Sequence, residues 1–351
     1  MVSLPLADAA AAGAGRRPTR LERRSRWRWY ETVFWLAAAA CPLLVPDDLV
    51  LASQVLIAGL FALSLDLLLG YGGIVSLGHA AFFGIGAYSA GLLARHGWGE
   101  PVSGLLLSGL VAGAAGFLLS FIIVRVRGIA LLMVTLGISL VLHEAAVKAY
   151  AVTGGDDGLQ GVAIDPVLGL FAMDLWGRTA FGYSLAVVFA GFLLARRLTA
   201  SPFGLALQGL RENSRRMAAI GASLRRHSAL IYTVSAALAG IAGGLLTQTT
   251  EFVSVEVLGF QRSAEVLIML ILGGAGHLYG AFVGAAVFMI VRDQLAAANP
   301  EYWFFWLGLM LVVVVLFARG GILGGLAAIA GRLGRRVPGR DKAGRNGGGP
   351  Q

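Results

Sequence analysis

Long apolar runs, separated by short polar or charged stretches, make up most of this chain between residues 33 and 318. The longer runs reach the roughly 20 residues that a helix needs to cross the hydrocarbon core of a membrane. Ten apolar runs occur in all, at residues 33–46, 49–69, 74–94, 102–124, 128–148, 180–198, 228–249, 263–275, 280–291 and 303–318. The pattern predicts an all-α fold: a polytopic transmembrane helical bundle with about ten membrane segments.

Several of these runs are short or interrupted. Pro42 and Pro46 break the first run, and only a glycine-rich stretch at 273–280 separates the runs at 263–275 and 280–291. Non-helical backbone is tolerated at membrane depth only where protein or a cavity covers it. Two arrangements are therefore open for residues 263–291: two short spans, or broken or re-entrant helices that do not cross completely.

The basic residues indicate an orientation, because cytoplasmic loops of membrane proteins retain Lys and Arg. With the N-terminus inside, 23 of the 28 basic residues fall on the cytoplasmic side, at 1–32, 125–127, 196–227 and beyond 318. Acidic residues gather instead in the loop at 149–179, which we expect to be external. We expect both termini to be cytoplasmic, with a basic extension at 1–32, a transmembrane domain at 33–320 and a basic, disordered tail at 321–351.

Composition supports a membrane protein and excludes other classes. Hydrophobic residues make up 57% of the chain and charged residues 13%, against roughly 25% charged in a soluble domain. The net charge of +9 does not indicate nucleic-acid binding, since no soluble basic domain carries it. The single cysteine, Cys41, excludes an intrachain disulfide and a cysteine-based metal site.

Glycine is abundant, with 50 residues, which indicates close helix packing inside lipid. Six glycines lie within apolar runs at positions where a small residue allows two backbones to approach: Gly84, Gly86, Gly91, Gly240, Gly243 and Gly244. We expect them to serve packing.

The sequence lacks the motifs of common catalytic sites. The phosphate-binding pattern GxxxxGK[ST] is absent, since the only lysines are Lys148 and Lys342 and neither follows a glycine. His143-Glu144 lacks the second histidine of a zinc-protease helix. We therefore predict that the chain is not an enzyme and holds no catalytic residue, metal or cofactor.

Two ionisable residues interrupt apolar runs, which is costly inside a membrane and is typical of functional positions. Asp66 lies just before Gly70-Tyr71-Gly72-Gly73, and His79 lies between Ser76 and Phe82. Both side chains should face the interior of the bundle. Two interpretations are open for each: Asp66 lines a transport path or anchors the glycine-rich turn, and His79 lines the path or is satisfied between helices.

Two loops are informative. The loop at 149–179 contains Thr153-Gly154-Gly155-Asp156-Asp157-Gly158 and is either a docking surface or a solvated connector. The loop at 196–227 contains Ser201-Pro202-Phe203-Gly204, in which Ser201 can cap a helix that Pro202 begins, and Gly221 as a break. We predict a short amphipathic helix there, which either docks on a partner or lies on anionic lipid.

These segments resemble the LivM-type permeases of the ATP-binding cassette importers for branched-chain amino acids. The stretch from Leu65 to Tyr88 is similar to the signature of that family. Residues 153–159 resemble the external loop of that family. Residues 201–221, which include Arg211-Glu212-Asn213, resemble its cytoplasmic loop, and residues 272–281 resemble its late glycine motif. One departure is that Arg215-Arg216-Met217 stands before Gly221, where many importer coupling loops have Glu-Ala-Ala-x-x-x-Gly.

The resemblance implies a permease subunit of a bacterial inner membrane that imports leucine-like amino acids. Its implied partners are a second homologous permease, two cytoplasmic P-loop ATPases that bind ATP and Mg²⁺, and a periplasmic solute-binding protein. The alternatives are the same machine carrying urea, short amides or aromatic acids, and a stand-alone ion-coupled secondary transporter.

The resemblance also implies site residues. The residues that would form the loop coupled to the ATPases are Ser201, Pro202, Phe203, Gly204, Arg211, Glu212, Asn213 and Gly221. The residues that would line or gate the substrate path are Asp66, Tyr71, Ser76, His79, Phe82 and Phe83.

Overall fold

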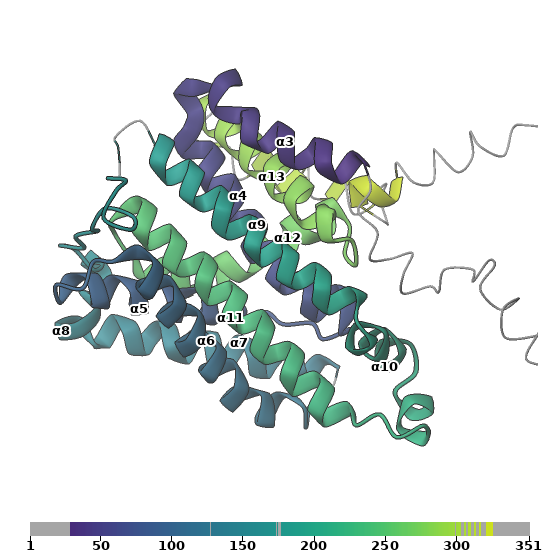
Figure 1. Cartoon of the computed structure of the whole chain (residues 1–351). Coiled ribbons are helices and arrows are strands. Elements are labelled where there is room, and N and C mark those ends of the chain that lie inside the picture. The colour runs from purple at the N-terminus through teal and green to yellow at the C-terminus, as the bar shows by residue number, and fades with distance from the viewer. Residues whose placement is uncertain are drawn as a thin grey trace, which may run out of the picture.

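The computed structural model describes residues 29–126, 128–172, 174, 177–298, 300–302, 305–306, 308–309, 312–313, 316 and 321–325. Most of the predicted basic extension and tail, and much of the apolar run at 303–318, therefore lie outside the described residues. The described part is a bundle of helices (Figure 1). Its elements are α3 (Trp29–Leu44), η1 (Pro46–Asp48), α4 (Leu49–Asp66), η2 (Leu67–Tyr71), α5 (Ala80–Arg95), α6 (Pro101–Ile123), α7 (Ile129–Lys148), α8 (Tyr150–Thr153), η3 (Gly155–Asp157), α9 (Arg178–Ala200), α10 (Pro202–Ala219), α11 (Leu224–Thr250), η4 (Val255–Leu258), α12 (Phe260–Gly273) and α13 (Leu278–Ala298).

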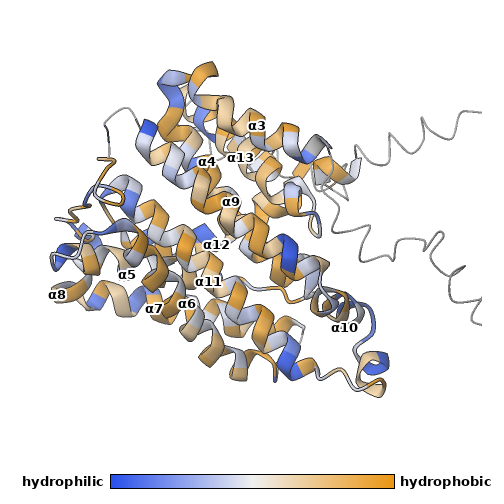
Figure 2. Cartoon of the chain, in the orientation of Figure 1, coloured by the Kyte–Doolittle hydropathy of each residue, from blue (hydrophilic) through white to orange (hydrophobic). Residues whose placement is uncertain are grey.

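The helical bundle confirms the predicted fold class. Among the described residues, six helices are long and apolar enough to cross a membrane: α4 with its flanking turns, α6, α7, α9, α11 and α13. Hydrophobic residues dominate the middles of these helices, and hydrophilic residues gather toward their ends (Figure 2). Nine of the ten predicted runs coincide with described helices, and α3 extends across the domain boundary expected after residue 32.

Three of the nine helices are too short to span alone, of which α3 has 16 residues and contains Pro42. Helix α5 has 16 residues and α12 has 14, so at about 1.5 Å per residue both are shorter than the roughly 30 Å hydrocarbon core. For residues 263–291, the short α12 beside the longer α13 favours the broken-helix arrangement.

The apolar run at 74–94 is not one helix, because α5 begins only at Ala80. The chain before it is held in a non-helical path inside the bundle. The backbone N–H of Leu77 donates to Thr135 Oγ1 at 3.2 Å, and the N–H of Ala80 donates to Ser263 Oγ at 3.0 Å. Gly73, with a φ of 67°, turns the chain into this path. Hydrophobicity alone did not reveal the break.

Helix α11 lies at the centre of the bundle and contacts α4, α5 and α6. Glycines allow these contacts to be close, as predicted. A Cβ on Gly243 of α11 would collide with the backbone carbonyl of Phe83 in α5. One on Gly86 of α5 would collide with the backbone of Gly240, which in turn lies against Ala112 of α6. Close backbone packing of this kind holds membrane helices together where lipid removes the hydrophobic driving force.

The two informative loops lie at opposite ends of the bundle, with α8 at one end and α10 at the other (Figure 1). In the α8 loop, Gly154 and Gly158 adopt positive φ values of 79° and 74°. The resulting turn places Leu159, which is fully buried, against Val253 through two backbone hydrogen bonds. The Thr153–Leu159 motif therefore anchors this loop in the core, while the side chains of Asp156 and Asp157 stay exposed.

Candidate functional site

Helix α10 begins as the sequence predicts. Ser201 Oγ accepts a hydrogen bond from the N–H of Gly204 at 3.4 Å, and Pro202 lies in the first turn. The backbone leaves helical geometry at Asn213, whose Oδ1 accepts a hydrogen bond from the N–H of Arg216 at 3.0 Å. Gly221, with a φ of 88°, ends the second segment. The predicted amphipathic helix is thus two short helical segments joined by a kink.

One side of α10 seats it on the bundle. Leu207 and Leu210 are buried, and Phe203 stacks on His227 of α11 with 5.4 Å between the ring centroids. Gly204 is buried against the carbonyl of Thr199, where a side chain would not fit. Phe203 and Gly204, two of the predicted coupling residues, therefore help to hold α10 against the bundle.

The opposite side of α10 is open. Its exposed residues include Glu212, Arg215 and Arg216, and they continue into Ile220 directly after the helix, which is 76% exposed. This side of α10 therefore presents arginines and one apolar side chain to its surroundings.

Arg211 connects α10 to the spans. Its Nη1 donates a hydrogen bond to the carbonyl oxygen of Gly70 in the π-helix η2, which extends α4. Close by, the buried Asp66 accepts a hydrogen bond from the backbone N–H of Gly276 through Oδ1, at 2.6 Å. Gly276 lies in the turn between α12 and α13. We call Asp66, Gly70, Arg211 and Gly276 the joint, because these four residues bring α4, α10 and the α12–α13 turn together.

The joint has no room for larger residues. A Cβ on Gly70 would collide with Asp66 Oδ1 and with the backbone of Gly276. Gly276 itself has a φ of 86°, which residues other than glycine rarely adopt. Of the two interpretations of Asp66, these contacts favour the anchor over the lining of a path.

Asp66→Ala is expected to loosen the joint. The substitution removes the acceptor of the Gly276 N–H, and a buried donor left without a partner costs about 1–3 kcal/mol. The melting temperature of the purified protein in detergent should fall. Asp66→Asn keeps an oxygen in the same place and is the matched control, which should melt closer to the unchanged protein. Equal melting temperatures for Asp66→Ala and the unchanged protein would contradict this role.

His79 is completely buried at the start of α5. Its Nε2 lies 2.9 Å from Ser64 Oγ of α4, and its ring stacks on Phe61 with centroids 5.6 Å apart. Phe82 and Ser76 are also buried, and Tyr71 is partly buried beside the core. These contacts place the His79 ring between α4 and α5, with Nε2 bonded to Ser64 and Nδ1 buried without a hydrogen-bond partner among the described residues.

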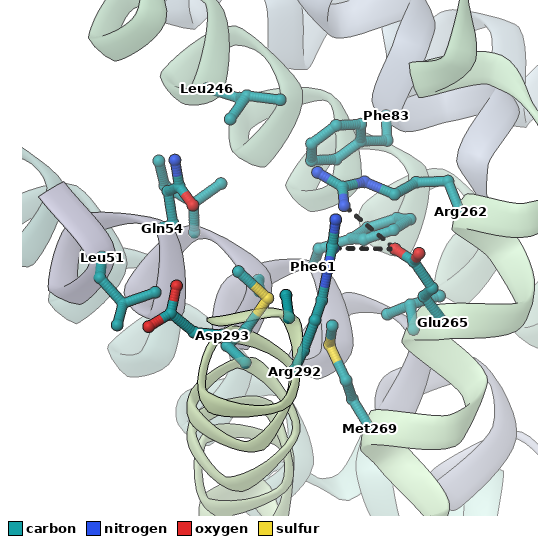
Figure 3. Close-up of a pocket in the computed structure, with 15 residues that line it drawn as sticks. Leu51, Gln54, Phe61, Phe83, Leu246, Arg262, Glu265, Met269, Arg292 and Asp293 are labelled. Atoms are coloured by element: carbon teal, nitrogen blue, oxygen red, sulfur yellow. Dashed lines mark hydrogen bonds and ion pairs between the residues drawn. The ribbon is translucent and has the colours of Figure 1, made fainter. Parts of the chain in front are cut away.

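Phe83 is the one residue of the predicted path that lines the cavity in Figure 3. This cavity, of about 350 Å³, lies among α4, α5, α11, α12 and α13. Four charged residues line it: Arg262 and Glu265 from α12, and Arg292 and Asp293 from α13. We call it the charged cavity.

An ion-pair cluster forms one wall of the charged cavity. Arg262 Nη1 lies 3.1 Å from Glu265 Oε2, and Arg292 Nη1 lies 3.9 Å from the same oxygen (Figure 3). The guanidinium of Arg262 also lies over the ring of Phe83, at 5.6 Å from its centroid. Glu265 is largely shielded, with 13% of its side chain exposed. The three residues also line a second cavity of about 420 Å³, so the cluster separates two cavities.

Sequence reasoning did not single out this cluster. Arg262 and Glu265 stand three positions apart at the start of one apolar run, and Arg292-Asp293 directly follows another, at 280–291. Opposite charges at that spacing on an apolar helix are the signal that could have identified it.

Comparison with known proteins identifies the family. The family described as the permease component of the branched-chain amino acid transport system matches residues 49–315. The chain is 32% identical to the high-affinity branched-chain amino acid transport system permease protein LivM of Escherichia coli (strain K12), over 82% of this chain and 72% of that protein. A probable LivM permease of Methanocaldococcus jannaschii is 24% identical, over 67% of this chain and 77% of that protein.

A second kind of relative matches a shorter stretch. The LivH permease protein of Salmonella typhimurium is 29% identical over 126 residues, which is 35% of this chain and 40% of that protein. No solved structure matches the chain significantly. These relatives do not favour a carrier of urea, amides or aromatic acids, or an ion-coupled transporter. From the match over residues 49–315 and the identity to LivM, the chain belongs to the family of permease components of branched-chain amino acid transport systems.

Proposed function

We propose that this chain is a permease subunit of an ATP-driven importer and passes branched-chain, leucine-like amino acids across a bacterial inner membrane. The observation that carries the proposal is the joint, which links α10 at one end of the bundle to α4 and to the α12–α13 turn. An importer whose ATPases are separate chains needs such a link between its docking helix and its spans.

Helix α10 is the element that docks on an ATPase. It carries the exposed Ile220 among exposed arginines, a composition that suits a protein contact. A helix that only lay on lipid would not need the hydrogen bond from Arg211 to the Gly70 carbonyl at the end of α4.

The partners follow from the family and from the sequence. The chain matches both LivM and LivH permeases, which supports a second, homologous permease beside it. ATP and Mg²⁺ bind to two cytoplasmic ATPase subunits, which accords with a sequence that contains no P-loop pattern. A periplasmic solute-binding protein delivers the amino acid.

The contacts suggest how movement is transmitted. Closure of the ATPases on ATP displaces α10, and Arg211 passes the displacement to the carbonyl end of η2. Asp66 passes it on to the α12–α13 turn. Rigid helices pivoting around such a point open the path alternately to the two sides.

Purification from native membranes tests the assembly. The chain, tagged and extracted in mild detergent, should co-purify with two P-loop ATPases and a second permease, and vesicles containing the complex and its binding protein should take up leucine only with ATP. Recovery of the chain alone, with uptake driven by an ion gradient, would overturn the proposal.

Ile220→Asp is expected to release the ATPases. A charge in place of an exposed apolar contact is unfavourable when the contact surface is desolvated. The ATPases recovered with the tagged chain should fall several-fold, while the melting temperature stays the same because Ile220 is 76% exposed. Leu168→Asp, at a position of the opposite loop that is 68% exposed, is the control and should retain them. Equal recovery for both variants would remove Ile220 from the docking surface.

A further inference from the structure

The charged cavity combines features that the joint and α10 do not use. Its wall carries two guanidinium groups and two carboxylates, and the remaining lining is mostly apolar. A cavity of about 350 Å³ falls within the roughly 300–1,000 Å³ of small-molecule sites. Ionisable side chains within membrane helices are costly and mark the paths of substrates and ions.

The charges are arranged in two separate groups. The cationic group, Arg262 and Arg292, is gathered around Glu265 at one wall. The carboxylate of Asp293 lies away from it, beside Leu51 (Figure 3). Gln54, also lining the cavity, offers an amide. A ligand in this space therefore meets positive charge on one side and negative charge on another.

We propose that the charged cavity is a binding site for the transported amino acid in its zwitterionic form. The α-carboxylate binds the guanidinium groups of Arg262 and Arg292, and the ammonium group binds Asp293. The apolar side chain packs against Phe61, Leu246 and Met269. This inference rests on the proposed function and deepens it, because it names the residues of the permease that recognise the cargo.

Three physical reasons support a zwitterion over a simple anion or cation. The formal charges of the four residues sum to zero, so a ligand of zero net charge leaves the site neutral. A guanidinium presents a planar fork of donors that matches a carboxylate. A ligand with only one charged group would leave one of the two charged sides of the cavity without its complement.

The position of the cavity connects it to the joint. Leu51 and Gln54 line it near the beginning of α4, whereas Gly70 contacts Arg211 beyond the other end of that helix. The α12–α13 hairpin carries Gly276 of the joint at its turn and the charged residues of the cavity on its two helices. Because Glu265 and Arg292 face each other across the hairpin, a shift between α12 and α13 changes the cationic wall that holds the carboxylate.

Photo-crosslinking tests the site directly. The probe is the diazirine analogue of leucine, added to vesicles that contain the whole complex without its binding protein. Mass spectrometry should find the label on the cavity face of α4, between Leu51 and Phe61, and excess leucine should abolish it. Isopentylamine and 4-methylpentanoate, which each lack one charged group of leucine, should compete at least about tenfold less well.

Variants of the charged residues sharpen the test. Asp293→Asn and Arg262→Gln should each reduce labelling about tenfold or more, and Arg262→Lys should restore part of it. Lys148→Gln is the control, since Lys148 pairs with Glu144 on the exposed face of α7 and its side chain is 76% exposed. Asp293 is itself exposed, so its variant tests the site even if Arg262→Gln does not fold.

The outcomes separate the two proposals. ATP-driven leucine uptake by the unchanged complex, together with labelling elsewhere or labelling that Asp293→Asn leaves unchanged, overturns the cavity as the cargo site and leaves the proposed function intact. Failure of the unchanged complex to take up leucine with ATP and binding protein overturns the proposed function, and the cargo site with it.

Discussion

Arg211→Ala is expected to uncouple ATP hydrolysis from transport. The substitution removes the hydrogen bond from α10 to the Gly70 carbonyl, which is the contact that joins the docking helix to α4. Couplings between distant sites are typically worth about 5- to 150-fold. In vesicles containing the whole complex, leucine uptake should therefore fall by at least about tenfold, while the ATPases remain bound and continue to hydrolyse ATP.

The neighbouring arginines provide the control. Arg215 lies on the same helix and makes none of the hydrogen bonds of the joint, so Arg215→Ala removes the same charge without touching the joint. It should leave the ratio of leucine taken up to ATP hydrolysed unchanged. A normal ratio in Arg211→Ala would show that movement reaches α4 by another route.

Gly243→Val is expected to prevent the permease from folding. A Cβ at Gly243 would collide with the carbonyl of Phe83, and a backbone atom cannot move aside as a flexible side chain can. Overpacking a tight core costs about 1–3 kcal/mol, and more where helices must separate. The helices concerned, α5 and α11, form the centre of the bundle. The yield of monodisperse protein in size-exclusion chromatography should fall to near zero.

Gly182→Val is the matched substitution. Gly182 lies in α9 with no atom within 4 Å of the position of its Cβ, so valine should be tolerated there. Comparable yields for Gly243→Val and Gly182→Val would contradict the close packing of α5 and α11.

The elements of this fold were largely predictable, because each depends on neighbouring residues. A long apolar run is sufficient to place a helix such as α6, and Ser201-Pro202 is sufficient to begin α10. The break before α5 was not predictable. It depends on Thr135 and Ser263, which lie far away in the sequence and bond the backbone of residues 77–80.

The joint was also not predictable, because its contacts join residues that are far apart in the sequence. Asp66 is separated from Gly276 by 210 positions, and Arg211 from Gly70 by 141. The sequence predicted that Asp66 and Arg211 matter, since a carboxylate in an apolar run and a motif in a basic loop are both conspicuous. Their proximity is a property of the folded bundle. The charged cavity was missed for a related reason, because its charges are spread over α12 and α13 and become a site only when the hairpin closes.

The π-helix η2 allows residues at the end of α4 to rotate about the helix axis. In η2 the N–H of Gly72 bonds to the carbonyl of Leu67, five positions back, so this turn holds one residue more than an α-turn. If the wide turn migrates by one residue along α4, each residue that it passes rotates by about 100° about the helix axis. The number of backbone hydrogen bonds stays the same during such a migration. Migration of the π-turn therefore lets the end of α4 present a different face to its neighbours, and no part of the helix has to unfold.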